Sequence, residues 1–169
     1  MEPGEKLQAE TYVYRACYIH KRDADNNFTI MVRHFTPHPK NDKDGLSVNW
    51  DGKASPESTL AILGSQYKSG KTIFKEHKDY GICKLLVSHI NDLPEVKESI
   101  FAPVKNTPCP KGEPDNDSHS LITFTKHPLG DTCETVLGMY EHAKANGHVP
   151  FSLEEVEKQQ REIRNQWGL

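Results

Sequence analysis

The sequence predicts an α+β fold with a largely antiparallel sheet, one intervening helix and two C-terminal helices. Three observations lead to this prediction. Short segments rich in aromatic and β-branched residues, the composition of strands, recur through the first three quarters of the chain. One segment with helix-capping signals interrupts them near residue 55, and two more follow residue 130. Strands grouped apart from helices are typical of α+β folds with antiparallel sheets.

Residues 11–19 and 28–35 are expected to form the first two strands, joined as a β-hairpin. Both segments are apolar and rich in β-branched and aromatic residues, and the connection between them contains several Asp and Asn residues, which favour turns. Arg15 and Arg33 stand out as polar side chains within these strands. Either they face solvent on the open side of the sheet, which is the commoner case, or they point to a ligand.

The next expected strand has one buried and one polar face. Leu46, Val48 and Trp50 alternate with Ser47 and Asn49, the pattern of a half-buried strand. The three apolar side chains are expected to face the core. The serine and the asparagine then share the opposite face, where they are available to a ligand.

A helix is expected to begin at Ser55. Its hydroxyl can accept hydrogen bonds from the backbone N–H groups of the first turn, Pro56 fits the first helical position, and Glu57 suits the positive end of the helix dipole. Pro103 lacks a backbone N–H and marks the strand that contains it as an edge strand. The strands expected after this helix are 71–77, 81–90, 100–104 and 119–124.

Two helices are expected after residue 130. The first begins at Asp131 or Thr132 and ends before Gly147. The second opens with a capping box at Ser152 and extends to Trp167. Its few apolar residues form one narrow stripe, made of Leu153, Val156, Ile163 and Trp167. We expect this stripe to dock either on the rest of the domain or on a partner chain.

The composition favours a single cytosolic domain. The formal charge is -3 and no basic block is present, which disfavours non-specific nucleic-acid binding. No segment approaches the roughly 18 consecutive apolar residues of a membrane helix, and no secretory signal is visible. The four cysteines contain no C-x-x-C pair, so reduced thiols are expected and no cofactor is assigned. We expect a flexible N-terminus at 1–10, one domain at 11–150, and a C-terminal helix at 151–169.

Two polar clusters far apart in the sequence, the first at residues 33–50 and the second at 115–119, are predicted to meet in one pocket. Arg33 and His119 are expected at its centre. His119 and His34 are the candidate catalytic groups, because imidazole exchanges protons near neutral pH. The alternative for each is an ordinary surface histidine. The side chains expected to hold a ligand are Arg15, Arg33, Ser47, Asn49 and Asn116.

A cation site is a further alternative at the second cluster. Asp115, Asp117 and His119 fall on one face if the strand begins early, and two carboxylates with an imidazole could ligate a divalent cation. The other interpretation is a solvated loop whose Asp and Asn side chains bond nearby backbone groups. No other spacing of metal ligands supports the cation site, so no metal is assigned.

Three short motifs resemble those of a group of small bacterial proteins of no established activity. The motifs are Arg33-x-Phe35, Gly45-Leu46-Ser47-Val48 and Asn116-x-x-His119-x-x-Ile122. The resemblance spans residues 13–125. It implies one shared site formed by Arg33, Ser47, Asn116 and His119.

A second resemblance is to ADP-ribosyltransferase-like toxins. It is carried by Tyr14-Arg15 on the first strand and by the later order of loop, strand and helix. In that family an Arg or His on an early strand contacts NAD and a later Glu is catalytic. The resemblance therefore implies an NAD contact for Arg15. No glutamate on a strand matches the catalytic position, and Glu76 is the nearest.

Three functions remain open, of which metal-dependent hydrolysis through Asp115, Asp117 and His119 has the least support. The first is a small cytosolic binding or accessory protein, part of a bacterial defence or toxin–antitoxin module, whose pocket holds a small anionic ligand through bidentate arginine hydrogen bonds. The second is a transferase or hydrolase that uses NAD or a nucleotide, with an arginine on the phosphates and a histidine as general acid or base. In the first, the C-terminal helix binds a partner protein.

Overall fold

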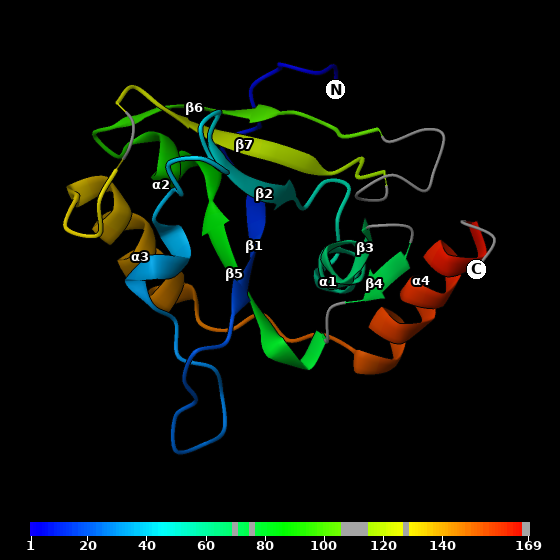
Figure 1. The fold of residues 1–169 in the computed structure, drawn as a ribbon. Coiled ribbons are helices and arrows are strands. Elements are labelled where there is room, and N and C mark those ends of the chain that lie inside the picture. Colours follow the sequence, from blue (N-terminus) through cyan, green and yellow to red (C-terminus); the bar gives the residue numbers. More distant parts are fainter. Residues whose placement is uncertain (69–70, 75–76, 106–114, 127–128, 167–169) are drawn as a thin grey trace.

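Five strands form one antiparallel sheet in the order β5-β1-β2-β7-β6. The computed structural model describes residues 1–68, 71–74, 77–105, 115–126 and 129–166 (Figure 1). The strands of the sheet are β1 (Tyr12–Tyr18), β2 (Leu46–Trp50), β5 (Tyr80–Leu86), β6 (Val96–Phe101) and β7 (His119–Phe124). A separate hairpin pairs β3 (Ser65–Lys68) with β4 (Lys71–Phe74).

The helices confirm the predicted α+β class, with one helix between strands β2 and β3 and two at the C-terminus. Within the described residues, none is long and apolar enough to cross a membrane. The α-helices are α1 (Pro56–Gly64), α2 (Val87–Asn91), α3 (Glu134–Asn146) and α4 (Leu153–Gln166). A 3-10 helix spans Val32–Phe35.

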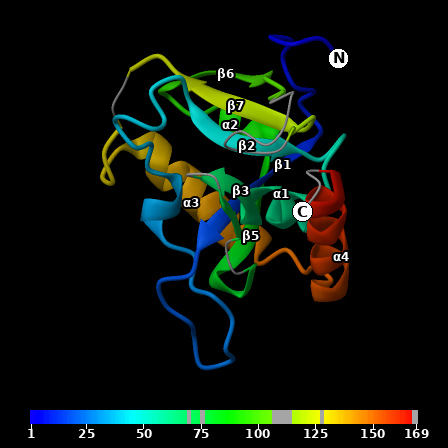
Figure 2. The same cartoon turned by 45° about the vertical axis from the view of Figure 1, so that its right-hand side comes forward.

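The strands bury side chains on both faces of the sheet. On β1, Val13 and Cys17 belong to the larger core, which also contains buried residues of α3 and the 3-10 helix. Tyr14 and Ala16 alternate with them and pack into a smaller core with Leu60 of α1. Figures 1 and 2 show α3 on one side of β1, and α1 with α4 on the other. Side chains that alternate along β1 therefore contribute to two separate cores.

The predicted start of α1 is confirmed. The Ser55 hydroxyl accepts a hydrogen bond from the Ser58 backbone N–H at 3.0 Å, and Pro56 occupies the first helical position. The Ser58 hydroxyl lies 3.0 Å from the Ser55 backbone nitrogen and closes the capping box. These bonds fix the first turn of α1, the helix that faces strands β1 and β2.

The predicted hairpin of residues 11–19 with residues 28–35 is wrong. The two arms, both within the described residues, do not pair: the isolated bridge between Arg22 and Phe28 starts in the connection, and Val32–Phe35 is a 3-10 helix. A strand has two edges. β5 occupies one edge of β1 over seven residue pairs, whereas β2 pairs with the other edge only at Val13 and Tyr14. Beyond Tyr14 the second arm meets β1 through side chains, since His34 Nε2 donates to the Tyr18 carbonyl and Arg15 Nε donates to the His34 carbonyl. Phe35 of this arm is fully buried.

The predicted strand 81–90 is too long. It ends at Leu86, and α2 begins at Val87. The buried residues Val87 and Ile90 are three apart, which is helical spacing. A continuous apolar run cannot distinguish a buried strand from a buried helix by its periodicity alone, which explains the error.

The N-terminal residues, predicted to be flexible, run along the outer edge of β6. The Gly4 backbone N–H donates to the Phe101 carbonyl at 2.7 Å, and the Leu7 N–H donates to the Ser99 carbonyl at 2.9 Å. Leu7 is buried. β6 is an edge strand of the sheet, and these residues cover its open hydrogen-bonding groups. It ends at Phe101, so Pro103 lies outside it and the predicted strand 100–104 is displaced.

The C-terminal helix α4 docks on the domain through α1. Val156 is fully buried and Ile163 packs into the same small core, whereas Leu153 at the start of the helix is 48% exposed. Both ribbon views place α4 beside α1 (Figures 1 and 2). The predicted stripe therefore meets the domain over part of its length. Trp167, its last predicted member, lies outside the described residues.

Candidate functional site

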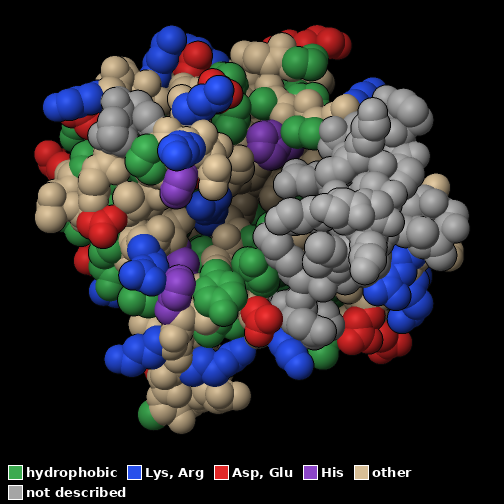
Figure 3. All heavy atoms as spheres, in the orientation of Figure 1, with side chains coloured by type: hydrophobic (Ala, Val, Ile, Leu, Met, Phe, Trp, Pro, Cys, Tyr) green, Lys and Arg blue, Asp and Glu red, His purple; other side chains and the backbone are tan. Residues whose placement is uncertain are grey.

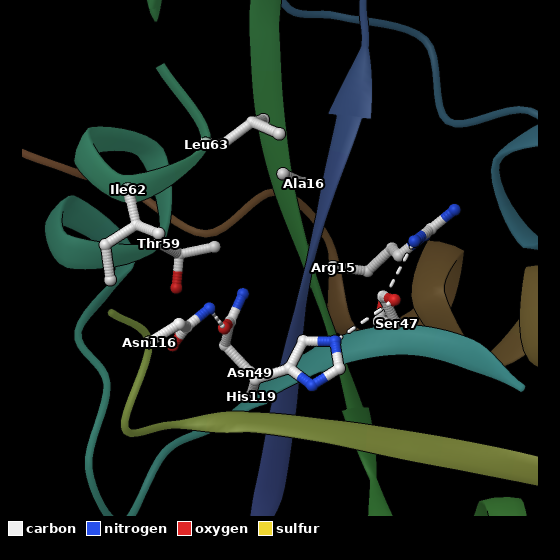
Figure 4. Close-up of a pocket in the computed structure, with 9 residues that line it drawn as sticks. All are labelled: Arg15, Ala16, Ser47, Asn49, Thr59, Ile62, Leu63, Asn116 and His119. Atoms are coloured by element: carbon white, nitrogen blue, oxygen red, sulfur yellow. Dashed lines mark hydrogen bonds between the residues drawn. The ribbon is translucent and has the colours of Figure 1, made fainter. Parts of the chain in front are cut away.

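A cavity of about 170 Å³ lies where α1 faces strands β1, β2 and β7 (Figure 4). Its sheet side is polar, and its helix side carries Ile62 and Leu63. In the space-filling view of Figure 3, this side of the molecule is hollowed near its centre, with basic and histidine side chains along one border of the hollow. The cavity is smaller than the 300–1,000 Å³ of drug-sized pockets, so it suits a small ligand or one group of a larger one.

Strand register brings three polar side chains to this cavity. Ser47 and Asn49 are two residues apart on β2 and share a face. Asn49 lies directly opposite His119 of β7 in the antiparallel ladder. His119 is therefore a diagonal neighbour of Ser47, and at the separation of diagonal neighbours a side chain as long as histidine can reach the serine.

Hydrogen bonds select one tautomer of His119 when the ring is neutral. Nδ1 lies 2.7 Å from the Ala102 backbone carbonyl, which can only accept, so Nδ1 carries the proton. Nε2 then has a free lone pair and lies 3.2 Å from the Ser47 hydroxyl. The hydroxyl donates to this lone pair.

The side-chain amide of Asn49 is oriented by its neighbours. Its Oδ1 accepts from Asn116 Nδ2 at 2.8 Å and lies 3.2 Å from the Ser118 hydroxyl. Asn116 Oδ1 in turn accepts from the Ser118 backbone N–H at 3.1 Å. Because Oδ1 is held on this side, Asn49 Nδ2 points to the cavity, and it has no hydrogen-bond acceptor among the described residues (Figure 4). Two N–H donors are thus ready for a ligand.

Arg15 fills the place where β1 and β2 separate. Pairing between these strands stops at Tyr14 and Asn49. Beyond that point, Arg15 Nη1 donates to the Ser47 carbonyl at 2.8 Å and Nε donates to the His34 carbonyl at 3.1 Å. No carboxylate of the described residues forms an ion pair with this guanidinium. Arg15 therefore joins the strands and leaves a positive charge at the border of the cavity.

Arg33 does not share the cavity with His119, which corrects the site predicted from the sequence. Its side chain is on the surface, with Nη1 3.4 Å from His20 Nδ1. It borders a different hollow, together with Lys21 and Asp131. The 3-10 helix turns Arg33 away from the face that a strand at residues 28–35 would have given it. Arg15 supplies the positive charge instead.

His34 is also outside the cavity, and its ring is held by the backbone. Nδ1 accepts from the Met31 N–H at 2.9 Å, and Nε2 lies 2.7 Å from the Tyr18 carbonyl and donates to it. The side chain is buried, and burial lowers the pKa of His34 below its usual value, with a smaller effect of the nearby His20. Both nitrogens are engaged, so this ring ties the 3-10 helix to β1 and has no nitrogen available to a substrate.

The described residues show no cation site. Asp115 and Asp117 are exposed, and no group of three or more His, Cys, Asp or Glu gathers in that part of the chain to hold a metal. Glu76, the nearest match to a catalytic glutamate, lies outside the described residues.

Sequence reasoning missed the helix side of the cavity. Thr59, Ile62 and Leu63 of α1 line it, and the Ala102 carbonyl orients His119. The local sequence around these residues indicates only a capped helix and the end of a strand. Their role at the cavity depends on the packing of α1 across the sheet. No signal in the sequence could have identified them.

The chain matches no known protein family, and no curated protein or solved structure is detectably similar to it. The resemblances described above therefore stay predictions, and the functional argument rests on the cavity itself.

Proposed function

We propose that this protein binds a small anionic ligand in the cavity between α1 and the sheet. The observation that carries the proposal is the amide network that holds Asn49 Oδ1 and leaves Asn49 Nδ2 facing the cavity. Such fixed N–H donors need no rearrangement on binding, which lowers the entropy cost of association.

The other polar groups suit the same ligand. Arg15 places a positive charge, which no carboxylate of the described residues pairs, at the border of the cavity, and a charge-assisted hydrogen bond is roughly twice as strong as a neutral one. His119 can donate from Nε2 when it is protonated, and the Ser47 hydroxyl can donate or accept. Ile62 and Leu63 offer an apolar wall to a short aliphatic part. Inorganic phosphate and small carboxylates fit this combination.

The cellular setting is part of the proposal. We place the protein in the cytosol, where its cysteines stay reduced. An accessory role in a bacterial defence or toxin–antitoxin module is supported by the resemblance of the short motifs alone. A partner protein would bind the exposed side of α4, since Val156 is already buried against the domain.

Calorimetric titration with phosphate, acetate and succinate tests the proposal. Asn49→Asp keeps the acceptor that Asn116 and Ser118 bind but replaces the free donors with a negative charge. We expect it to weaken anion binding by about tenfold or more, because a donor at the cavity becomes a repulsive acceptor. Asn41→Asp, in an exposed loop, adds the same charge elsewhere and is the matched control. Equal affinities of Asn49→Asp and wild type for the tightest anion would refute the proposal.

A transferase or hydrolase that acts on NAD or a nucleotide is the second candidate. The unprotonated Nε2 of His119, which accepts from the Ser47 hydroxyl at the cavity, favours it, because such a nitrogen can act as a general base. At about 170 Å³ the cavity has room for one part of a dinucleotide. NAD or a nucleotide that binds more tightly than phosphate in the same titration would favour this candidate.

A further inference from the structure

Ser47 and His119 have the arrangement of a nucleophile and its base. The Ser47 hydroxyl lies 3.2 Å from His119 Nε2, and Nδ1 of the same ring lies 2.7 Å from the Ala102 carbonyl. A hydroxyl, a base within hydrogen-bond reach and a third group that orients the base are the recurring components of nucleophilic catalysis. We infer that Ser47 is a catalytic nucleophile for acyl transfer from small carboxylic esters, activated by His119.

The Ala102 carbonyl takes the place that a carboxylate has in a serine triad. It fixes the tautomer in which Nε2 can receive the serine proton, which is one of the functions of the triad carboxylate. A neutral carbonyl stabilises the imidazolium less than a carboxylate does. The expected activity is therefore modest, and it depends on geometry more than on the strength of the base.

The backbone of Ser47 is held in place as well. Arg15 Nη1 donates to its carbonyl at 2.8 Å, and β7 pairs with its strand on the other side, with Leu121 opposite Ser47. The nucleophile thus stands on a strand fixed along both edges, and rigid elements position reacting groups better than loops do.

Asn49 and the apolar wall define the substrate class. A carbonyl oxygen that becomes negative during attack needs N–H donors near the serine, and Asn49 Nδ2 supplies them from the same face of β2. Ile62 and Leu63 face this polar strand from α1 and would contact the acyl chain. A cavity of about 170 Å³ restricts that chain to a short one.

The reaction balances without an added reagent other than water. Ser47 Oγ attacks the ester carbonyl carbon while its proton passes to His119 Nε2. The bond from that carbon to the ester oxygen of the alcohol part breaks, and the leaving alkoxide takes the proton from Nε2. Water then attacks the acyl-serine, gives one proton to Nε2, and releases the carboxylic acid as Oγ takes the proton back. The product carboxylate is an anion of the class proposed above, so this inference rests on the proposed function.

Labelling with diisopropyl fluorophosphate tests the inference directly. The reagent forms a bond between Ser47 Oγ and phosphorus with loss of fluoride, and the folded wild-type protein should gain one diisopropylphosphoryl group on the peptide that contains Ser47. Peptide mass spectrometry identifies the position. Folded wild-type protein that is unlabelled at Ser47, while a standard serine esterase in the same tube is labelled, would overturn the inference.

Variants identify the role of each residue. Ser47→Ala should lose both the label and the hydrolysis of p-nitrophenyl acetate, and His119→Gln should slow both by about a hundredfold. Ser88→Ala, a partly buried serine on α2 away from the cavity, is the matched control and should behave as wild type. Circular dichroism checks that each variant is folded. His119→Gln that is labelled as fast as wild type would remove the base from the mechanism.

The two proposals fail separately. Anion binding that is lost in Asn49→Asp, together with no label on Ser47, would leave a binding site without acyl transfer. A label on Ser47 in a protein that binds no anion would support the nucleophile and overturn the proposed anion site.

Discussion

The guanidinium of Arg15 donates to the backbone carbonyl of Ser47 at 2.8 Å, at the point where β1 and β2 stop pairing. A side chain on one strand thus replaces a missing backbone hydrogen bond to the next. This contact closes the sheet next to the cavity and brings a positive charge to its border.

Arg15→Ala should lower the free energy of unfolding by about 2 kcal/mol, because two charge-assisted hydrogen bonds to backbone carbonyls are lost and the side chain is partly exposed. Urea denaturation measures this change. Arg161→Ala, at an exposed position of α4, is the control and should cost little. If both variants unfold at the same urea concentration, Arg15 does not hold the strands together.

Gly45→Ala should destabilise the protein by about 1–3 kcal/mol. Gly45 has φ +141°, and a Cβ there would lie 2.7 Å from the Ile122 carbonyl oxygen of β7. The new methyl group must push β2 away from β7, and Ser47 lies two residues further along β2. Gly130→Ala is the matched control, because a Cβ there meets nothing within 4 Å. Thermal unfolding of both variants compares them, and equal melting temperatures would contradict the close approach.

Val156→Ala should cost about 2 kcal/mol, from two buried methyl groups and the space they leave. Val156 is fully buried where α4 docks on the small core with α1. Leu153→Ala removes more carbon from the same helix, but this side chain is 48% exposed, so a smaller loss is expected. Chemical denaturation ranks the two. The reverse order would mean that α4 is not docked as the structure shows.

Stability should fall as the pH drops below about 6.5, in part because of His142. Its Nε2 accepts the Leu86 N–H at 3.1 Å, and its ring stacks on His89 with 3.9 Å between centroids. Burial, followed by the charge of His89, lowers the pKa of His142 from its ordinary 6.5. Below pH 6.5 the unfolded chain therefore binds a proton at His142 that the folded chain does not bind. The contribution of His142 to the free energy of unfolding is complete above pH 6.5 and decreases as the pH falls to the pKa of the folded state.

Denaturation at a series of pH values measures this dependence. His142→Gln should show a shallower loss of stability below pH 6.5, because the side chain no longer titrates. Lys144→Gln, on the exposed side of the same helix, removes a charge but no histidine and should keep the slope of the wild type. A slope unchanged in His142→Gln would assign the effect to other groups, of which His34 is the first to test, since burial lowers its pKa too.

Local signals in the sequence were enough for several elements. The alternation of Leu46 and Val48 with Ser47 and Asn49 placed β2 and its polar face correctly, and Ser55 with Pro56 placed the start of α1. These features depend on side-chain periodicity and on capping, which involve residues a few positions apart. The same alternation put Ser47 and Asn49 among the candidate site residues before any tertiary contact was known.

The tertiary structure alone decided which strands pair and which charge reaches the cavity. Residues 28–35 have the composition of a strand, yet they end in a 3-10 helix that turns Arg33 to another surface, and Arg15 stands beside Ser47 where β1 and β2 stop pairing. Pairing between segments far apart in sequence depends on competition for a limited number of edges and on burial of whole faces. A local pattern contains neither, which is why composition and capping determined the elements while packing determined the site.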